Sequence, residues 1–160
     1  MVDLRGRTIA FTSPTSNSGF KVPSVLLKEQ FGMEAGRDFN TMYSGKHDNS
    51  ILGVVNRDYE AAAIANVVLR QMLARDVVSE FQYRTIYRLE TFPTTAYGIT
   101  HSLHPDLQQK IREAFFSFDW EGSGLQREFE EEQFIPITYK EHWTIIRDVD
   151  EALGITYPTR

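Results

Sequence analysis

The sequence predicts an α/β fold built on a parallel sheet, and three observations lead to this prediction. Short β-type runs alternate with helix-type segments through residues 1–90. The composition, with 41% hydrophobic and 24% charged residues, is that of a globular chain. The length of 160 residues corresponds to one domain or two small lobes. Strands that alternate with helices at this spacing form right-handed βαβ units, in which the strands are parallel.

Each predicted element follows from a local pattern of apolar residues. The helix at 21–31, for example, has apolar residues near helical spacing, accommodates Pro23 in its first turn and ends at Gly32. The predicted strands are 7–12, 39–44, 60–65, 83–89 and 96–100, and the other predicted helices are 45–55, 67–74, 105–118 and 140–153, with an irregular acidic stretch at 120–132. Residues 90–95 read as an extended connection, so we place a boundary there between domains 1–90 and 91–160.

Charge and composition exclude several function classes. The net charge is −5 and no basic cluster occurs, so the chain is not expected to bind nucleic acid or an anionic membrane through bulk charge. Any bound anion must therefore be held by donors aimed at it. No apolar run approaches the length of about 18 residues that a membrane span needs, and residues 1–7 lack an apolar region, so we expect neither a transmembrane helix nor a signal peptide in this chain. The absence of cysteine excludes disulfides and thiolate chemistry.

Polar residues follow the first predicted strand, where ligands bind in open parallel sheets. Ser16, Asn17 and Ser18 lead into the start of a helix, whose unpaired N–H groups and partial positive charge attract anions. Their side-chain donors, together with the close backbone approach that Gly19 permits, favour a site for a tetrahedral oxyanion. The alternative is that these residues are only helix caps and turn formers.

Two further candidates follow the second and third predicted strands. His47 lies at a helix start, which lowers the pKa of an imidazole, whereas a bound anion would raise this pKa, and in either state the side chain can donate to an oxyanion. The alternative is a surface histidine. Asn66 either caps the following helix or reaches the ligand, and the sequence does not decide between these roles.

The sequence offers no obvious set of residues for catalysis or for a metal. No two carboxylates pair at a plausible site, and no P-loop or nucleophile motif occurs. His101 and His104, followed by Asp106, have no third ligand placed near them. We therefore expect no enzymatic activity, no cofactor and no metal site.

Several of these segments resemble the phosphate, phosphite and phosphonate substrate-binding proteins of ABC importers. Residues 3–20 resemble the family's first strand and its Asp-Pro-x-Ser-Thr-Ser-Gly-Tyr turn, whose hydroxyl residues hold the phosphonate. Residues 43–48 resemble the family's Gly-Ser-His motif, whose histidine contacts the ligand, and residues 92–95 resemble an Ile-Pro-Asn-Asp segment. The resemblance extends from Asp3 to about Gly154.

The resemblance implies a non-enzymatic solute-binding component of an ABC importer, periplasmic and working with a permease. Domain 1–90 would be a ligand-binding lobe like that of type II periplasmic binding proteins. Domain 91–160 would hold the hinge return strand and the C-terminal helices of a partial first lobe, because the family's signal peptide and first half-lobe have no counterpart in this chain. The alternative is a stand-alone sensing or interaction domain that kept the fold and lost tight binding.

The resemblance also implies a ligand set and an assembly. The set comprises Ser16, Asn17, Ser18, His47, Asn66 and Thr95. Asn66 and Thr95 stand where the family has acidic residues, so a small oxyanion without an amine is expected to bind at least as well as an aminophosphonate. With half a lobe missing, the faces formed by Leu107, Ile111 and Phe115 and by Ile145, Val149 and Leu153 are expected to be uncovered, so we expect a homo-oligomer or a partner that completes the lobe.

Overall fold

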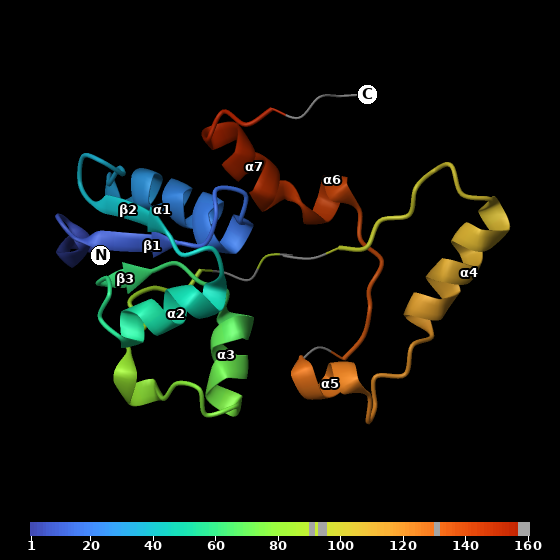
Figure 1. Ribbon diagram of the computed structural model, residues 1–160. Helices are drawn as coiled ribbons and strands as arrows, with labels where there is room; N and C mark the ends of the chain where they lie inside the picture. Colours follow the sequence, from blue (N-terminus) through green and yellow to red (C-terminus); the bar gives the residue numbers. More distant parts are fainter. Residues whose placement is uncertain (90–91, 93–95, 130–131, 157–160) are drawn as a thin grey trace. The chain divides into compact units, whose positions relative to one another are not determined.

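The computed structural model of the protein describes residues 1–89, 92, 96–129 and 132–156. The chain divides into two compact units (Figure 1). Unit 1 comprises Met1–Phe92 and Thr144–Arg160, and unit 2 comprises Pro93–Trp143. Among the residues so described, no helix is long and apolar enough to cross a membrane.

Unit 1 is built on a parallel sheet of three strands in the order β2-β1-β3. The strands are β1 (Thr8–Phe11), β2 (Asn40–Tyr43) and β3 (Ala61–Ala62). In the central strand, Ile9 pairs with Thr41 of β2 and with Ala61 of β3. The α/β fold with a parallel sheet is therefore confirmed, and the first three predicted strands are present, although β3 is much shorter than predicted.

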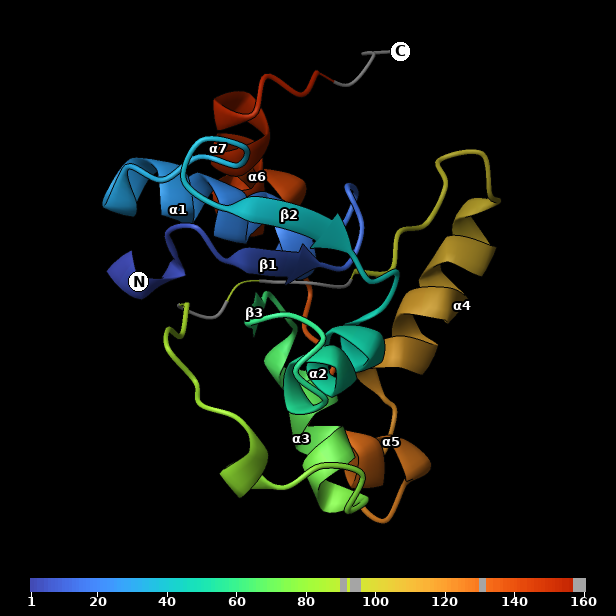
Figure 2. The same ribbon diagram turned by 60° about the vertical axis from the view of Figure 1, so that its left-hand side comes forward.

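Helices cover both faces of this sheet (Figures 1 and 2). The chain leaves β1 in one direction and returns across it after β2, so right-handed crossovers place α1 and α2 on opposite faces. The helices and helical turns of unit 1 are η1 (Val2–Leu4), the π-helix η2 (Asn17–Lys21), α1 (Val22–Phe31), α2 (His47–Val55), α3 (Asn66–Ala74), η3 (Glu80–Gln82) and α7 (Thr144–Ala152). As predicted, α1 has proline in its first turn and ends at Gly32, which has a positive φ of 60°.

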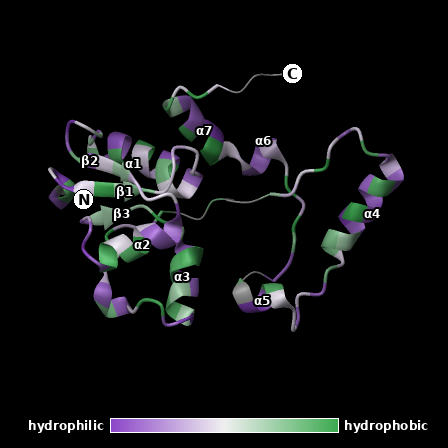
Figure 3. Cartoon of the chain, viewed as in Figure 1, coloured by the Kyte–Doolittle hydropathy of each residue, from purple (hydrophilic) through white to green (hydrophobic). Residues whose placement is uncertain are grey.

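The core of unit 1 follows the alternation of side chains along β1. Ile9 and Phe11 point to one face and pack with Leu27 of α1. Ala10 lies between them on the other face and is fully buried. A second apolar cluster of Ile51, Met72 and Val78 joins α2 to α3. Figure 3 shows β1 and much of α3 in the green of apolar residues.

Unit 2 contains three helices among its described residues: α4 (Pro105–Phe116), α5 (Gly124–Glu128) and α6 (Tyr139–His142). The start of α4 is as predicted, with the His104 ring accepting a hydrogen bond from the Asp106 N–H at 3.4 Å. Aromatic rings pack together beside this helix, and they belong to Tyr97, Phe115, Phe118, Trp120 and Phe134.

Four predictions for the C-terminal half are wrong. Residues 83–89 and 96–100 form no strand, because neither segment pairs with a neighbouring strand. The acidic stretch contains α5, which begins where the Ser123 hydroxyl accepts a hydrogen bond from the Gln126 N–H at 3.1 Å. The last predicted helix is interrupted at Trp143 and forms α6 and α7.

The expectation of an uncovered face on the last helix is also wrong for Val149. This residue is 5% exposed, because α7 packs against α1 and η2 of the same chain. On α4, Leu107 is 46% exposed, as expected for an uncovered face, whereas Ile111 and Phe115 are partly buried.

Candidate functional site

Three loops meet at the carboxyl edge of the sheet, which we define as the loops that follow β1, β2 and β3. Parallel pairing places the three strand ends on the same side. The Gly45 N–H donates to the Thr12 carbonyl at 2.9 Å and thereby ties the second loop to the first. The Ala65 N–H donates to Nδ1 of His47 at 3.0 Å and ties the third loop to the start of α2. The carboxyl edge is therefore a connected set of loops.

The first loop forms a capped π-turn. The Ser16 hydroxyl accepts a hydrogen bond from the Gly19 N–H at 3.0 Å, so Ser16 is the N-cap of η2. The Ser16 carbonyl accepts from the N–H groups of Phe20 and Lys21 at 3.1 Å and 2.9 Å. The capping role that the sequence left open for Ser16 is therefore real, and its hydroxyl proton can still be donated to a ligand. η2 runs directly into α1, and single π-turns within helices are frequent at functional sites.

Asn17 and Ser18 are the first two residues of η2, and both are half-buried. Within the ranges that the structure describes, neither side chain has a hydrogen-bond partner. The first N–H groups of a helix have no acceptor inside the helix. Side-chain and backbone donors therefore coincide at this turn, which is the arrangement that an oxyanion requires.

Thr12 and Gly19 fix where this turn lies against the end of β1. The Thr12 N–H donates to the Gly19 carbonyl at 3.1 Å. A Cβ atom on Gly19 would lie 2.1 Å from Oγ1 of Thr12 and 2.9 Å from Oγ of Ser16, so a side chain there would displace the turn. Thr12 is 3% exposed, and its hydroxyl oxygen is buried without a partner in the described part of the chain. The sequence analysis missed Thr12, because a threonine that ends a strand carries no local signal of such a contact.

His47 is the first residue of α2 and is half-buried. Burial lowers the pKa of its imidazole below 6.5, and the neighbouring Asp48 carboxylate opposes this shift. Because Nδ1 accepts the hydrogen bond from Ala65, the neutral ring carries its proton on Nε2. His47 therefore offers an N–H donor without needing a positive charge.

The structure places the other candidates less favourably. Asn66 is the first residue of α3 and is exposed, and its side-chain oxygen accepts a hydrogen bond from the Val67 N–H at 3.0 Å. The N-cap position of α3 is Ala65, so Asn66 is not the cap that the sequence analysis considered. Thr95 lies outside the described residues. Ser44, which the sequence analysis did not single out, stiffens the second loop through a 2.5 Å hydrogen bond to Ser50.

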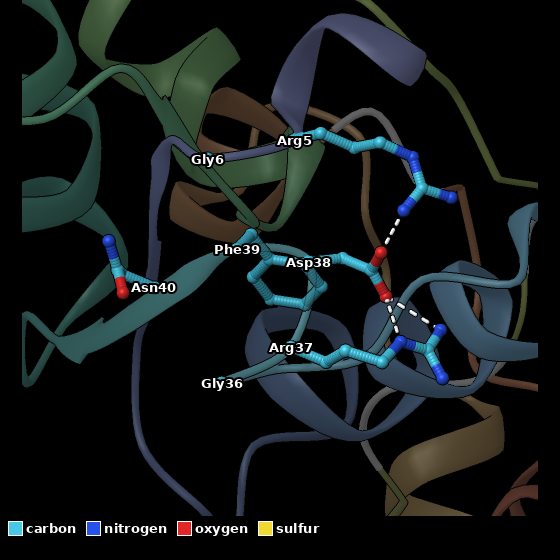
Figure 4. Close-up of a pocket in the computed structure, with 7 residues that line it drawn as sticks. All are labelled: Arg5, Gly6, Gly36, Arg37, Asp38, Phe39 and Asn40. Atoms are coloured by element: carbon cyan, nitrogen blue, oxygen red, sulfur yellow. Dashed lines mark hydrogen bonds and ion pairs between the residues drawn. The ribbon is translucent and has the colours of Figure 1, made fainter.

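Two hollows lie away from the carboxyl edge. One of about 300 Å³ lies at the amino ends of β1 and β2, where Figure 4 shows the Asp38 carboxylate between the guanidinium groups of Arg5 and Arg37. Asp38 also accepts from the Glu34 N–H at 2.9 Å, so these charges hold a turn together. The other, of about 800 Å³, is lined by charges of both signs, including Arg57 and Asp58. No group of three or more metal-ligating side chains occurs among the described residues.

Comparison with known proteins identifies the family to which this chain is similar. Residues 1–143 match the family described as ABC transporter, phosphonate, periplasmic substrate-binding protein. The phosphate-import protein PhnD of Mycolicibacterium smegmatis is 24% identical over an alignment that covers 92% of this chain and 48% of that protein. The chain thus spans about half the length of this curated relative.

A solved structure shares the fold. PhnD1 from Prochlorococcus marinus, in complex with methylphosphonate, matches with a TM-score of 0.68 and 18% identity over 95% of this chain and 58% of that one. The matched family is described as one of substrate-binding proteins of ABC transporters, in agreement with the solute-binding role that the sequence predicts.

Proposed function

The chain belongs to the family of phosphonate periplasmic substrate-binding proteins of ABC transporters, and from this premise we propose that unit 1 binds a phosphorus oxyanion at the carboxyl edge of its sheet. The observation that carries this proposal is the capped π-turn, in which Asn17 and Ser18 present side chains without partners in the described chain. As a member of this family, the protein would act in the periplasm and deliver its ligand to the permease of an ABC importer.

Four side chains supply the donors. Ser16 donates its hydroxyl proton while its oxygen caps the turn, and Asn17 and Ser18 donate freely. His47 donates from Nε2, because Nδ1 is engaged with Ala65. A neutral donor set of this kind binds through directed hydrogen bonds and the helix N-termini, which agrees with the acidic net charge of −5.

The ligand is a small oxyanion without an amine. By the family resemblance, Asn66 and Thr95 stand at positions where acidic residues would pair with the ammonium group of an aminophosphonate. Neither residue carries a charge here, so that ammonium group would lack its Coulombic partner. An unpaired buried polar group costs about 1–3 kcal/mol. Phosphite, phosphate and methylphosphonate keep every contact to the four donors and avoid this cost. They are therefore expected to bind at least as well as 2-aminoethylphosphonate.

Calorimetric titration of these four ligands at matched salt and pH tests the proposal. Asn17→Ala and Ser18→Ala are each expected to raise Kd about tenfold or more, since a hydrogen bond to a charged group is worth about 1.5–3 kcal/mol. Asn56→Ala, at the opposite end of α2 from His47, is the matched control and should leave Kd unchanged. Absence of saturable binding, or equal Kd for all variants, would contradict the proposed site, and a clear preference for the aminophosphonate would contradict the ligand class.

A further inference from the structure

A buried ion pair holds the last residue of the capped π-turn η2. Nζ of Lys21 is 2.7 Å from Oδ1 of Asp150, and both residues are only 6% exposed. The two residues are 129 positions apart in the sequence, so the contact is purely tertiary. Charges so deeply buried are stable only when paired, so this contact holds the segment of Lys21 and the segment of Asp150 together.

Lys21 belongs to the same π-turn as the proposed donors. It is the last residue of η2, and its N–H donates to the Ser16 carbonyl at 2.9 Å. The next N–H along the chain, that of Val22, donates to the Asn17 carbonyl. A displacement of Lys21 would therefore pass through two backbone hydrogen bonds to the residues that carry the donors.

Asp150 belongs to the C-terminal helix of unit 1. It lies on α7 beside Val149, and Ile146 on the preceding turn is likewise buried. The same helix packs against η2 and α1. The ion pair is thus part of the contact between α7 and η2.

We propose that Lys21 and Asp150 are positioning residues for the oxyanion site: their ion pair uses α7 to fix the π-turn in the geometry that aims Asn17 and Ser18 at the ligand. This inference rests on the proposed function. Stability alone does not account for the pair, because an apolar pair of similar volume at such a place is often equally stable or more so. A short, directed bond between charged groups defines the position of the turn more narrowly than apolar packing does.

The test separates position from stability. Lys21→Met/Asp150→Leu replaces the ion pair by apolar side chains, and its free energy of unfolding is expected to stay near that of the wild type. Its Kd for methylphosphonate is nevertheless expected to rise about tenfold. Without ligand, amide hydrogen exchange at Gly19 and Phe20, whose N–H groups are bonded to Ser16, is expected to accelerate by a similar factor. Asp150→Asn, which removes one charge and conserves size, should shift both quantities in the same direction.

Two further variants complete the design. Lys21→Arg keeps the pair and is expected to retain Kd within about threefold, because the positive charge and its donors remain. Lys28→Met removes one partner of the exposed contact between Lys28 and Glu34 and should leave both Kd and exchange unchanged.

The outcomes distinguish this inference from the function on which it rests. Wild-type Kd and wild-type exchange rates in the stable apolar variant would overturn the positioning role. A Kd that simply follows the free energy of unfolding across all variants would overturn it as well. If the wild type binds none of the oxyanions, the proposed function fails, and unchanged exchange at Gly19 and Phe20 would then overturn the positioning role independently.

Discussion

Replacing Gly19 by alanine places a methyl group where the capped π-turn η2 contacts the end of β1. The new Cβ would lie 2.1 Å from Oγ1 and 2.7 Å from Cγ2 of Thr12, and 2.9 Å from Oγ of Ser16. Each separation is far below van der Waals contact, and Thr12 is 3% exposed, so its side chain lies in the closely packed interior. The turn itself must therefore move away from the strand.

The magnitude follows from the size of that clash. Overpacking a filled position by one methyl group costs about 1–3 kcal/mol, so the free energy of unfolding should fall by about that amount. Restoring a contact of about 3.5 Å requires the turn to shift by about 1.4 Å, and a misplacement of about 1 Å is already enough to weaken a directed interaction about 100-fold. We expect the Kd for methylphosphonate to rise by about 10- to 100-fold.

Urea unfolding and calorimetric titration measure the two effects. Gly98→Ala is the control, because a Cβ there meets no atom within 4 Å and its backbone has no positive φ. Thr12→Ala/Gly19→Ala removes the two closest atoms and should restore most of the stability and affinity. A Gly19→Ala protein with the stability and Kd of the wild type would refute the reasoning, as would a double variant no better than the single one.

Three further predictions concern other parts of the chain. Burial lowers the pKa of the His47 imidazole, so the unfolded chain protonates this imidazole at a higher pH than the folded chain does. The free energy of unfolding should therefore fall as the pH drops through and below 6.5. His47→Gln should remove this contribution to the pH dependence in urea melts at about pH 5–8. Tyr59→Phe should lower the free energy of unfolding by about 1 kcal/mol, since the Tyr59 hydroxyl donates to the Asn49 carbonyl at 2.8 Å; an unchanged urea midpoint would contradict this. Leu107 and Phe116 of α4 are 46% and 50% exposed, so light scattering at micromolar concentration should detect self-association that Leu107→Lys reduces, whereas a monodisperse wild-type monomer would contradict it.

The first part of the fold could be predicted because its signals are local. The strand at Thr8–Phe11 is a short apolar run that is buried on both faces, and the helix Val22–Phe31 carries its own start and stop residues. The segment 83–89 has the composition of a strand, but Ile86 and Tyr87 are exposed and no neighbouring strand pairs with it. Pairing is a tertiary property, and no local pattern reports it.

The candidate site likewise contains residues that local patterns predict and contacts that they do not predict. Ser16, Asn17 and Ser18 could be proposed from the sequence because caps and turns have strong local preferences. The contact of Thr12 with Gly19 and the ion pair of Lys21 with Asp150 could not, since each depends on how separate segments pack. For His47, the sequence suggested the helix end as the cause of a lowered pKa, whereas the structure assigns the shift to burial.

Titration of isotope-labelled protein with methylphosphonate, followed by amide NMR, tests the central claim most directly, because it reports where the ligand lies. We predict saturable shifts at Asn17, Ser18 and Gly19 and at the His47 side chain, with smaller effects around Arg37 in the hollow at the opposite edge of the sheet. Shifts that are largest around Arg37, or no saturable shifts at the carboxyl edge, would contradict the claim that this edge binds the oxyanion.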